Sequence, residues 1–457
     1  MTSPKSFCRV EVRLHPIAGS NIRAEFWLPA IADWNGQFIN EGNGGFSGSI
    51  GGQYIGMQRG LGAGYASGGT DSGHTGAAED ASWALHNPIG LDDYAYRANH
   101  VTLGAAKELI ATFYGRDAAH AYFDGCSNGG REALMQARRY PDDYDAIISG
   151  APAMAFSRVM TSFAWNARAM ETPGAALSTQ DLALLHRAVL DRCDALDGAR
   201  DGVIEDPRNC PFDAAELRCT SQNQGACLSD AQIDAVRSLR RGPATSSGQQ
   251  ILPGFEWGSE SGWNDWITGA NAVQRRMAES FFRYMVHDDP RWSISQLNLD
   301  ADYTDARSGP GATIDSDNPD LTAFFRRGGK LLMYVGWTDA AISPQSTIDQ
   351  YNSIRGRIGA SHNNDIRLFV VPGMDHCGGG AGVANFDAIG ALDHWVHTHE
   401  APTQIIAVKH ENEIAAFLGR PTRVVATRPV CAWPNRVTYN GAGPTNDAAS
   451  FSCRTTN

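Results

Sequence analysis

The chain has 457 residues, of which 42% are hydrophobic and 19% charged, and its 38 Lys and Arg against 50 Asp and Glu give a formal net charge of −12. This apolar fraction excludes a disordered chain, and the length allows two or three domains or one large core with an inserted domain. The acidic balance argues against nucleic acid or an anionic membrane as the main partner. No uninterrupted apolar stretch reaches about 18 residues, so we expect no membrane-spanning helix.

Up to residue 157 the sequence alternates between strand and helix patterns. Residues 22–28 alternate as in a strand, and residues 95–114 carry apolar positions at helical spacing. A short apolar run, 119–123, leads into a Gly-rich turn, a helix-like stretch over 131–139 and a buried strand over 144–149. We assign residues 1–157 to the first part of an α/β core.

The character of the sequence changes between residues 158 and 325, which are rich in Asp, Gly, Cys, Trp and Arg and lack a strand–helix rhythm. The rhythm returns with apolar runs over 330–337 and 365–371, expected to be parallel strands buried on both faces, and a helix over 386–397. We predict one parallel-sheet domain, 1–157 and 326–457, interrupted by an inserted domain over 158–325.

A G-x-S-x-G pattern stands at Gly125-Cys126-Ser127-Asn128-Gly129. A nucleophile elbow needs a strand before the serine and a helix after it, with small flanking residues, so that a tight turn presents the hydroxyl above the sheet edge. The predicted strand and helix meet this requirement. The alternative is a Gly-rich turn with an idle serine. Cys126 is a poor rival nucleophile because the flanking glycines are placed symmetrically around Ser127.

Two polar residues follow the later predicted strands. Asp339 comes directly after the strand over 330–337, and His376 follows the strand over 365–371. Open α/β sheets place their sites at the carboxyl ends of strands, and the order Ser, acid, His is that of an elbow enzyme. We predict His376 as general base and acid, and Asp339 as the group that orients its imidazole.

The nine cysteines include no C-x-x-C pair, which disfavours redox and zinc-ribbon sites. Four of them fall within 193–227, as in local disulfide staples, and persistent disulfides indicate an oxidising compartment. Cys126 adjoins Ser127 and Cys377 adjoins His376. Spacing alone leaves two alternatives for these two cysteines, a disulfide between the two catalytic loops or two buried thiols.

The chain resembles the tannase and feruloyl esterase family, which includes the hydrolase of mono(2-hydroxyethyl) terephthalate. The matching segments are Trp34-Asn35-Gly36, Gly42-Asn43-Gly44-Gly45, Asp71-Ser72-Gly73-His74, Tyr96-Arg97, Gly125-Cys126-Ser127-Asn128-Gly129-Gly130-Arg131, Tyr140-Pro141-Asp142-Asp143, Gly150-Ala151-Pro152-Ala153, Gly336-Trp337-Thr338-Asp339 and Gly373-Met374-Asp375-His376-Cys377. The resemblance implies an α/β-hydrolase fold with a lid domain inserted between nucleophile and acid. It implies Ser127, Asp339 and His376 as the triad and a Cys126–Cys377 bridge.

An ester hydrolase needs two N–H donors for the tetrahedral oxyanion. The backbone N–H of Asn128, the residue after the nucleophile, should be one. The Gly-rich loop 42–45 suits the second because glycine lets the backbone approach the substrate closely, although it also fits an ordinary turn. By resemblance, Gly44 is the donor, with Gly45 as the second choice.

Three carboxylates crowd within eight residues at Asp194, Asp197 and Asp201. Such crowding is repulsive unless a cation lies among them, and hard oxygen ligands favour calcium, although the spacing is not that of an EF-hand. A solvated Asp/Gly turn is the alternative. The resemblance implies structural Ca²⁺, held by these three side chains and the carbonyls of Ala199 and Val203. Cys193 and Cys210 flank the loop and should bridge it, and the other expected pairs are Cys219–Cys227 and Cys431–Cys453.

The lid holds an aromatic and basic stretch. A lid over the triad could use Trp257, Trp263 or Trp266 to sandwich an aromatic acyl group, although many of its aromatic residues must form lid core. A second short set, Arg275, Arg276 and Arg283, could bind a free carboxylate on the substrate, with surface exposure as the simpler interpretation. The resemblance does not choose between gallate, hydroxycinnamate and terephthalate monoesters.

The sequence therefore predicts a serine esterase that cleaves small aromatic esters through an acyl-enzyme, as a monomer or weak oligomer. The alternatives are a hydrolase of terephthalate monoesters and, from another class, a catalytically silent calcium-dependent binding protein; a protease is poorly supported. We expect a secreted or periplasmic location. No signal peptide is visible at the start of the chain, so we expect the numbering to begin inside the mature protein. Cys8, the ninth cysteine, should then have its partner upstream and bond to none of the other eight.

Overall fold

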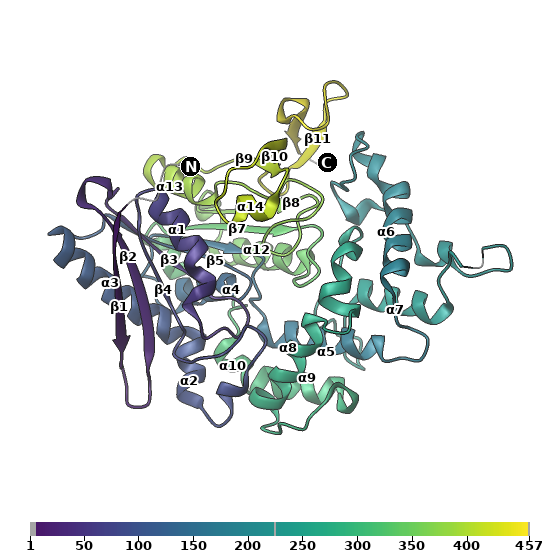
Figure 1. Cartoon of the computed structure of the whole chain (residues 1–457), viewed down its shortest axis with the longest axis horizontal. Helices are drawn as coiled ribbons and strands as arrows, with labels where there is room; N and C mark the ends of the chain where they lie inside the picture. The colour runs from purple at the N-terminus through teal and green to yellow at the C-terminus, as the bar shows by residue number, and fades with distance from the viewer. Residues whose placement is uncertain (1–5, 224, 456–457) are drawn as a thin grey trace.

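The computed structural model describes residues 6–223 and 225–455. Its centre is a sheet of eight strands in the order β1-β2-β4-β3-β5-β6-β7-β8 (Figure 1). In chain order the strands are β1 (Phe7–Leu14), β2 (Ile22–Pro29), β3 (Gln37–Glu41), β4 (Ala66–Thr70), β5 (His120–Cys126), β6 (Ala146–Gly150), β7 (Lys330–Gly336) and β8 (Ile366–Val371). Two smaller antiparallel pairs lie near the C-terminus, β9 (Gln404–His410) with β10 (Val424–Cys431) and β11 (Arg436–Tyr439) with β12 (Phe451–Arg454).

The expectation of a parallel sheet is right for most of the sheet and wrong for its first edge. All neighbouring pairs from β4–β3 to β7–β8 are parallel, whereas β1–β2 and β2–β4 are antiparallel. For β1–β2 the physical reason is the short connection between the two strands, because a parallel return would need a crossover of a dozen residues or more.

Helices cover both faces of the sheet and fill the insertion. They are α1 (Tyr54–Gly62), α2 (Pro88–Asp92), α3 (Ala98–Tyr114), α4 (Asn128–Arg139), α5 (Phe156–Met170), α6 (Thr179–Cys193), α7 (Asp230–Arg241), α8 (Val273–Phe281), α9 (Leu299–Ser308), α10 (Gly311–Ile314), α11 (Thr322–Arg326), α12 (Pro344–Ile358), α13 (Ala388–Thr398) and α14 (Glu413–Phe417). The helix expected over 95–114 is α3 preceded by one π-helical turn, Asp93–Arg97.

Side chains of the central strands alternate between two buried layers. Phe123 and Ile147 join the core under α3, α4 and α12, whereas their neighbours Tyr122 and Ile148 join the core under α13. Successive residues of a strand point to opposite faces, and burial of both faces explains why these strands read as continuous apolar runs. The sheet is thus a rigid support whose strand ends can position functional groups.

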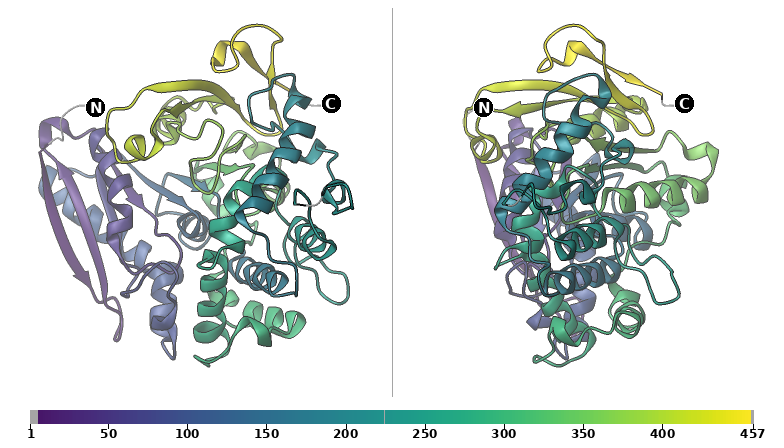
Figure 2. Two further views of the ribbon diagram at one scale, coloured as in Figure 1. Left: turned by 45° about the vertical axis from the view of Figure 1, so that its right-hand side comes forward. Right: turned by 90° about the vertical axis from the view of Figure 1, so that its right-hand side faces the viewer.

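The segment between β6 and β7 runs through α5 to α11 and, in its described part, adds no strand to the sheet. It lies to one side of the sheet (Figures 1 and 2) and has an apolar core of its own, to which Leu185, Val236 and Trp263 belong. α5 and α8 connect it to the sheet domain, where Phe156 packs edge-on against Phe46 with 5.4 Å between ring centroids. The division into domains at residues 157 and 325 stays a prediction.

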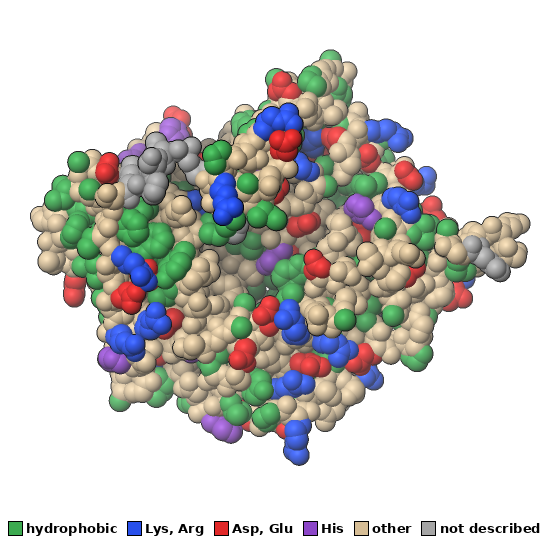
Figure 3. Space-filling model, in the orientation of Figure 1, with side chains coloured by type: hydrophobic (Ala, Val, Ile, Leu, Met, Phe, Trp, Pro, Cys, Tyr) green, Lys and Arg blue, Asp and Glu red, His purple; other side chains and the backbone are tan. Residues whose placement is uncertain are grey.

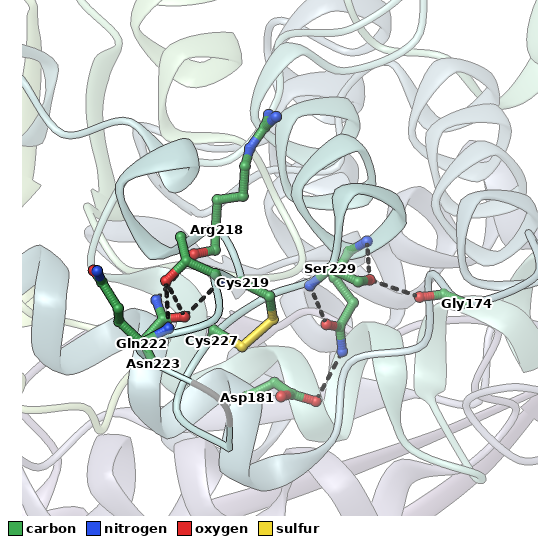
Figure 4. Close-up of a disulfide and its surroundings, with 10 residues drawn as sticks. Gly174, Asp181, Arg218, Cys219, Gln222, Asn223, Cys227 and Ser229 are labelled. Atoms are coloured by element: carbon green, nitrogen blue, oxygen red, sulfur yellow. Dashed lines mark hydrogen bonds between the residues drawn. A yellow bond between two sulfur atoms is a disulfide. The ribbon is translucent and has the colours of Figure 1, made fainter.

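Short-range contacts shape the helical pair α6 and α7. Each helix begins with a capping box, at Ser178 and at Ser229, in which the serine and the third helical residue cap each other. The Cys219–Cys227 disulfide closes the loop just before α7, and the Ser229 hydroxyl donates to Gly174 O at 3.3 Å (Figure 4). These contacts fix the outer end of the insertion.

Candidate active site

Ser127 occupies a sharp turn between β5 and α4. Its backbone has φ 63° and ψ −122°, a conformation that L-residues rarely adopt. The flanking glycines permit the turn, since a Cβ on Gly125 would lie 2.4 Å from Gly129 O. This arrangement is a nucleophile elbow, and it raises the serine hydroxyl above the carboxyl edge of the sheet.

His376 and Asp339 meet at the same edge. The imidazole Nδ1 lies 2.9 Å from Asp339 Oδ2, and the carboxylate is fully buried. Asp339 Oδ1 in turn accepts the N–H groups of Ala341 and Ile342, each at 2.8 Å. Because a carboxylate only accepts, Nδ1 carries the proton of the pair, and the lone pair of Nε2 is left for the nucleophile.

A disulfide joins the turn that carries Ser127 to the loop that carries His376. Cys126 and Cys377 are bonded, with their Cα atoms 5.9 Å apart across a sequence separation of 251. The bridge brings the residue before Ser127 next to the residue after His376. Of the two alternatives left open by spacing, the disulfide is confirmed.

The other expected cysteine pairs are also confirmed. Cys193–Cys210, Cys219–Cys227 and Cys431–Cys453 are bonded. Cys8 is exposed on β1 and bonds to none of these eight cysteines, as predicted. The three outer bridges fix the insertion and the C-terminal strands rather than the catalytic loops.

The Gly-rich loop after β3 packs against the elbow. A Cβ on Gly42 would lie 2.7 Å from Gly129 Cα, so the two backbones touch only because both residues are glycine. Gly45 has φ +57°, and a Cβ there would lie 2.3 Å from Ala78 O. Within the described residues the N–H groups of Gly44 and Gly45 donate no hydrogen bond. Asn128 is the first residue of α4, where N–H groups lack an intrahelical acceptor. The N–H groups of Asn128, Gly44 and Gly45 thus donate to no acceptor in the described part of the chain.

The segment 71–74, which was not assigned a role from the sequence, supports this loop from behind. The Ser72 hydroxyl accepts the side-chain amide of Asn43 at 2.8 Å, and His74 Nε2 lies 2.8 Å from Phe46 O. His74 also stacks on Trp83 with 3.8 Å between ring centroids. Burial lowers the pKa of His74, so a neutral ring can donate from Nε2 to the Phe46 carbonyl.

The insertion brings one of the three candidate tryptophans into contact with His376. The Trp266 ring lies edge-on to His376 with 5.0 Å between centroids. Trp263 is fully buried and donates to the Ser259 hydroxyl, and Trp257 packs against Phe212 in the core of the insertion. Trp266 is therefore the candidate residue to contact an acyl group, whereas Trp257 and Trp263 stabilise the insertion. The molecular surface is hollowed near the middle of the face in Figure 3, between the sheet domain and the insertion.

The three candidate arginines all have glutamate partners. Arg275 pairs with Glu171 at 2.5 Å, and Arg283 pairs with Glu279 at 3.0 Å. A longer pair, 3.5 Å, joins the half-exposed Arg276 to Glu79. Arg276 thus has the weakest ion pair of the three.

The acidic loop after α6 is folded around its own backbone N–H groups. Asp194 Oδ1 accepts Asp201 N and Gly202 N, Asp197 Oδ1 accepts Ala199 N at 2.8 Å, and Asp201 also pairs with Arg428. Burial, with the charges of Asp201 and Asp194, raises the pKa of Asp197 to about 6. In the described part of the chain no group of three or more His, Cys, Asp and Glu side chains is arranged to hold a metal ion.

The parallel sheet, the elbow and the His–Asp pair at later strand ends are features of the α/β-hydrolase fold. The family model for tannase and feruloyl esterase matches residues 8–454. The chain belongs to the tannase and feruloyl esterase family and is a carboxylic ester hydrolase.

Individual relatives cover most of the chain. The mono(2-hydroxyethyl) terephthalate hydrolase of Piscinibacter sakaiensis is 33% identical, over 96% of this chain and 82% of its own length. A probable feruloyl esterase B-2 of Aspergillus flavus is 32% identical, over 89% of this chain and 80% of its own length. The crystal structure of feruloyl esterase B from Aspergillus oryzae superposes with a TM-score of 0.90 at 28% identity, covering 99% of this chain and 92% of that one. These similarities confirm the predicted fold.

Proposed function

We propose that this esterase cleaves esters of small aromatic carboxylic acids through an acyl-enzyme on Ser127. The observation that carries the proposal is the Asp339–His376 hydrogen bond at the sheet edge, tied to the elbow by the Cys126–Cys377 bridge. The similarity to feruloyl esterases and to the terephthalate monoester hydrolase supports an aromatic acid as the acyl part.

Acylation begins at the serine hydroxyl. Ser127 Oγ attacks the ester carbon while its proton passes to Nε2 of His376, and Asp339 stabilises the imidazolium. The carbonyl oxygen becomes an oxyanion, which the N–H groups of Asn128 and Gly44 stabilise. Collapse of the tetrahedral species returns the C=O bond, and the leaving alkoxide takes the proton from Nε2.

Deacylation repeats the sequence with water. His376 Nε2 takes a proton from the water as its oxygen attacks the acyl carbon, and the same two N–H groups hold the second oxyanion. The Ser127–acyl bond then breaks, the serine regains its proton and the aromatic acid leaves. The elbow and the His–Asp pair thus serve both halves of the reaction.

The acyl group should lie against Trp266. This half-buried ring contacts His376, so an aromatic acyl group bonded to Ser127 would lie within reach of it. Edge and face contacts between aromatic rings contribute about 0.5–1.5 kcal/mol beyond area burial, which favours an aromatic over an aliphatic acid.

Turnover of methyl ferulate, methyl gallate and 4-nitrophenyl acetate by the wild type and Ser127→Ala tests the proposal. We expect the variant to lose hydrolysis of all three esters, and the wild type to show a burst of 4-nitrophenol equal to its active sites. Unchanged hydrolysis by Ser127→Ala contradicts the assignment. A wild-type protein that binds the esters and hydrolyses none of them would instead be the silent binding protein.

Terephthalate monoesters are the second candidate substrate class, because the similarity to their hydrolase extends over nearly the whole chain. Such a substrate carries a free carboxylate, and Arg276, with its long ion pair, is the arginine most easily released to bind it. Arg276→Ala should then lower kcat/KM for the monoester and leave methyl ferulate unaffected. Equal effects on both substrates would argue for the uncharged aromatic esters.

We also propose a structural calcium ion in the acidic loop. Asp194, Asp197 and Asp201, with the carbonyls of Ala199 and Val203, provide the hard oxygen ligands that calcium prefers. The raised pKa of Asp197 supports the proposal, because burial first, and then the charges of Asp201 and Asp194, favour a bound proton or a cation over the free carboxylate. The ion would stabilise the insertion and take no part in the chemistry. Metal analysis of the purified protein and its melting temperature with and without EGTA test this proposal.

Secretion or export to the periplasm is the location that we propose. Four disulfides support it, because such bonds persist in oxidising compartments. Among the described residues no helix combines the length and the apolar character needed to cross a membrane. Fractionation of the native host by activity against methyl ferulate tests the location.

A further inference from the structure

We infer that Glu132 and the side chains of Asn128 and Tyr94 are positioning residues that hold both sides of the oxyanion hole in one buried hydrogen-bond network. The inference rests on the proposed function, since it concerns the donors that this function requires. The network connects the first turns of α4 with the Gly-rich loop after β3.

Glu132 connects the two sides directly. Its Oε2 accepts the backbone N–H of Asn43 at 2.9 Å, which fixes the loop one residue before Gly44. Its Oε1 accepts the side-chain amide of Asn128 at 3.1 Å. One carboxylate therefore holds the residues that carry or adjoin both oxyanion donors.

Tyr94 makes the second connection. Its hydroxyl lies 2.7 Å from Gly45 O and 2.9 Å from Asn128 Oδ1, so its single proton is shared between the two acceptors. Asn128 Oδ1 also accepts Arg131 Nε at 2.6 Å, which fixes the orientation of the amide. Gly44 is thus held from both neighbours, through Asn43 by Glu132 and through Gly45 by Tyr94.

Because the network is buried, each of its groups needs its hydrogen-bond partner. Glu132, Asn128, Tyr94 and Arg131 are each at most 1% exposed, so a lost partner cannot be replaced by bulk water. Donors and acceptors alternate along the network, and a fully matched buried network fixes a single geometry. Oxyanion stabilisation depends on such preorganisation, because its donors must already point to where the charge develops.

The pattern allows a sharp test by exchange. In Glu132→Gln the new amide faces another N–H group in either orientation, that of Asn128 or that of Asn43. In Asn128→Asp an acceptor replaces the donor that faces Glu132. In the double variant E132Q/N128D the bond is reversed, since the new amide at position 132 donates to the new carboxylate at position 128 while the amide oxygen still accepts Asn43 N. The new carboxylate keeps an oxygen for Arg131 and Tyr94, so the bonds named above are all matched again. Only the long bond that the Asn128 amide donates to Asn43 O, at 3.5 Å, is lost.

We expect each single variant to lower kcat by about 10- to 100-fold, with KM within about threefold of wild type, because the donors act on the transition state. The double variant should have a kcat at least tenfold above that of the less active single variant. Tyr94→Phe keeps the ring and removes only the hydroxyl, so it tests the network even if the charge variants fold poorly. It should lower kcat about tenfold with little change in KM.

Gln136→Met is the matched control. Gln136 is buried one turn further along α4 and donates to Tyr96 O at 2.9 Å, outside the network. It should lower the melting temperature and leave kcat per burst-titrated active site unchanged. A merely structural role of the network predicts the same behaviour for Glu132→Gln and Tyr94→Phe, and that result, or a double variant no better than additive, overturns the inference. If Ser127→Ala is inactive while the network variants match wild type, the proposed function stands and the inference fails. If the wild type hydrolyses no ester, both fail.

Discussion

The Cys126–Cys377 bridge should contribute more to stability than any other disulfide of this chain. It closes a sequence separation of 251, whereas Cys219–Cys227 closes one of 8. In the chain-entropy relation the free energy of a bridge grows with the logarithm of loop length, which gives about 5.5 kcal/mol for the long loop and about 2.5 kcal/mol for the short one. Replacing the Cys126–Cys377 pair by alanines should therefore cost about 3 kcal/mol more than replacing the Cys219–Cys227 pair.

Catalysis should separate the two variants further. The long bridge holds the nucleophile loop against the base loop, and a misplacement of about 1 Å can cost about 100-fold in rate. The measurements are urea unfolding of the wild type and both double-alanine variants without reductant, and kcat per burst-titrated active site. We expect a large fall in kcat for C126A/C377A and none for C219A/C227A. Equal losses of stability, or an unchanged kcat in C126A/C377A, would refute this reasoning.

Three further predictions address the triad, the loop and the calcium site. Asp339→Asn should lower kcat by about 10⁴-fold with little change in KM, because the amide favours the wrong imidazole tautomer; a fall below tenfold removes Asp339 from the triad. Gly45→Ala should lower both the free energy of unfolding and kcat, since its Cβ would lie 2.3 Å from Ala78 O. Gly104→Ala is the control, because a Cβ at this position in α3 meets nothing within 4 Å. It should stabilise the fold by about 0.5–1 kcal/mol and leave kcat unchanged. In EGTA the free energy of unfolding should fall as pH rises from about 4 to about 6. The reason is that the pKa of Asp197 is raised from 3.8 to about 6 in the folded protein, which then holds a proton that the unfolded chain has released. Excess calcium should remove this dependence, and a flat profile in EGTA would contradict the crowding argument.

Local signals explain why the elbow could be predicted from the sequence. Its strand, turn and helix are contiguous, and the short residues around Ser127 are required by contacts within the same few residues. Asp339 and His376 could be singled out because each comes shortly after the end of an apolar strand. The antiparallel edge was missed because one of its strands lacks a local signal. β4 (Ala66–Thr70) reads Ala-Ser-Gly-Gly-Thr and has no apolar alternation.

The support of the oxyanion loop could not be predicted, because its bonds join distant segments. Tyr94 bonds to Gly45 across 49 residues and Glu132 to Asn43 across 89. A glutamate or a tyrosine on a helix carries no sign in the sequence that it will be buried against a loop. The same holds for the lid, where three tryptophans looked equivalent and only Trp266 contacts His376.

Two kinds of bond hold the loops around Ser127 in place, a disulfide for the loop of His376 and buried hydrogen bonds for the Gly-rich loop. The kind of bond follows from what each loop must do in the proposed mechanism. In the proposed mechanism the loop that carries His376 has to keep its imidazole aligned while it takes up and releases a proton in each half-reaction, and a covalent bridge would maintain that alignment in every protonation state. The oxyanion loop only has to present fixed N–H groups, which a buried network of uncharged and singly charged partners can do without a covalent bond. Loss of the bridge should therefore broaden the motion of His376, whereas loss of the network should displace Gly44 and leave the Asp339–His376 bond intact. Measuring the downfield proton of that hydrogen bond by NMR separates the two cases, because it should persist in Tyr94→Phe and weaken in C126A/C377A. Persistence in both would show that the bridge contributes to folding alone.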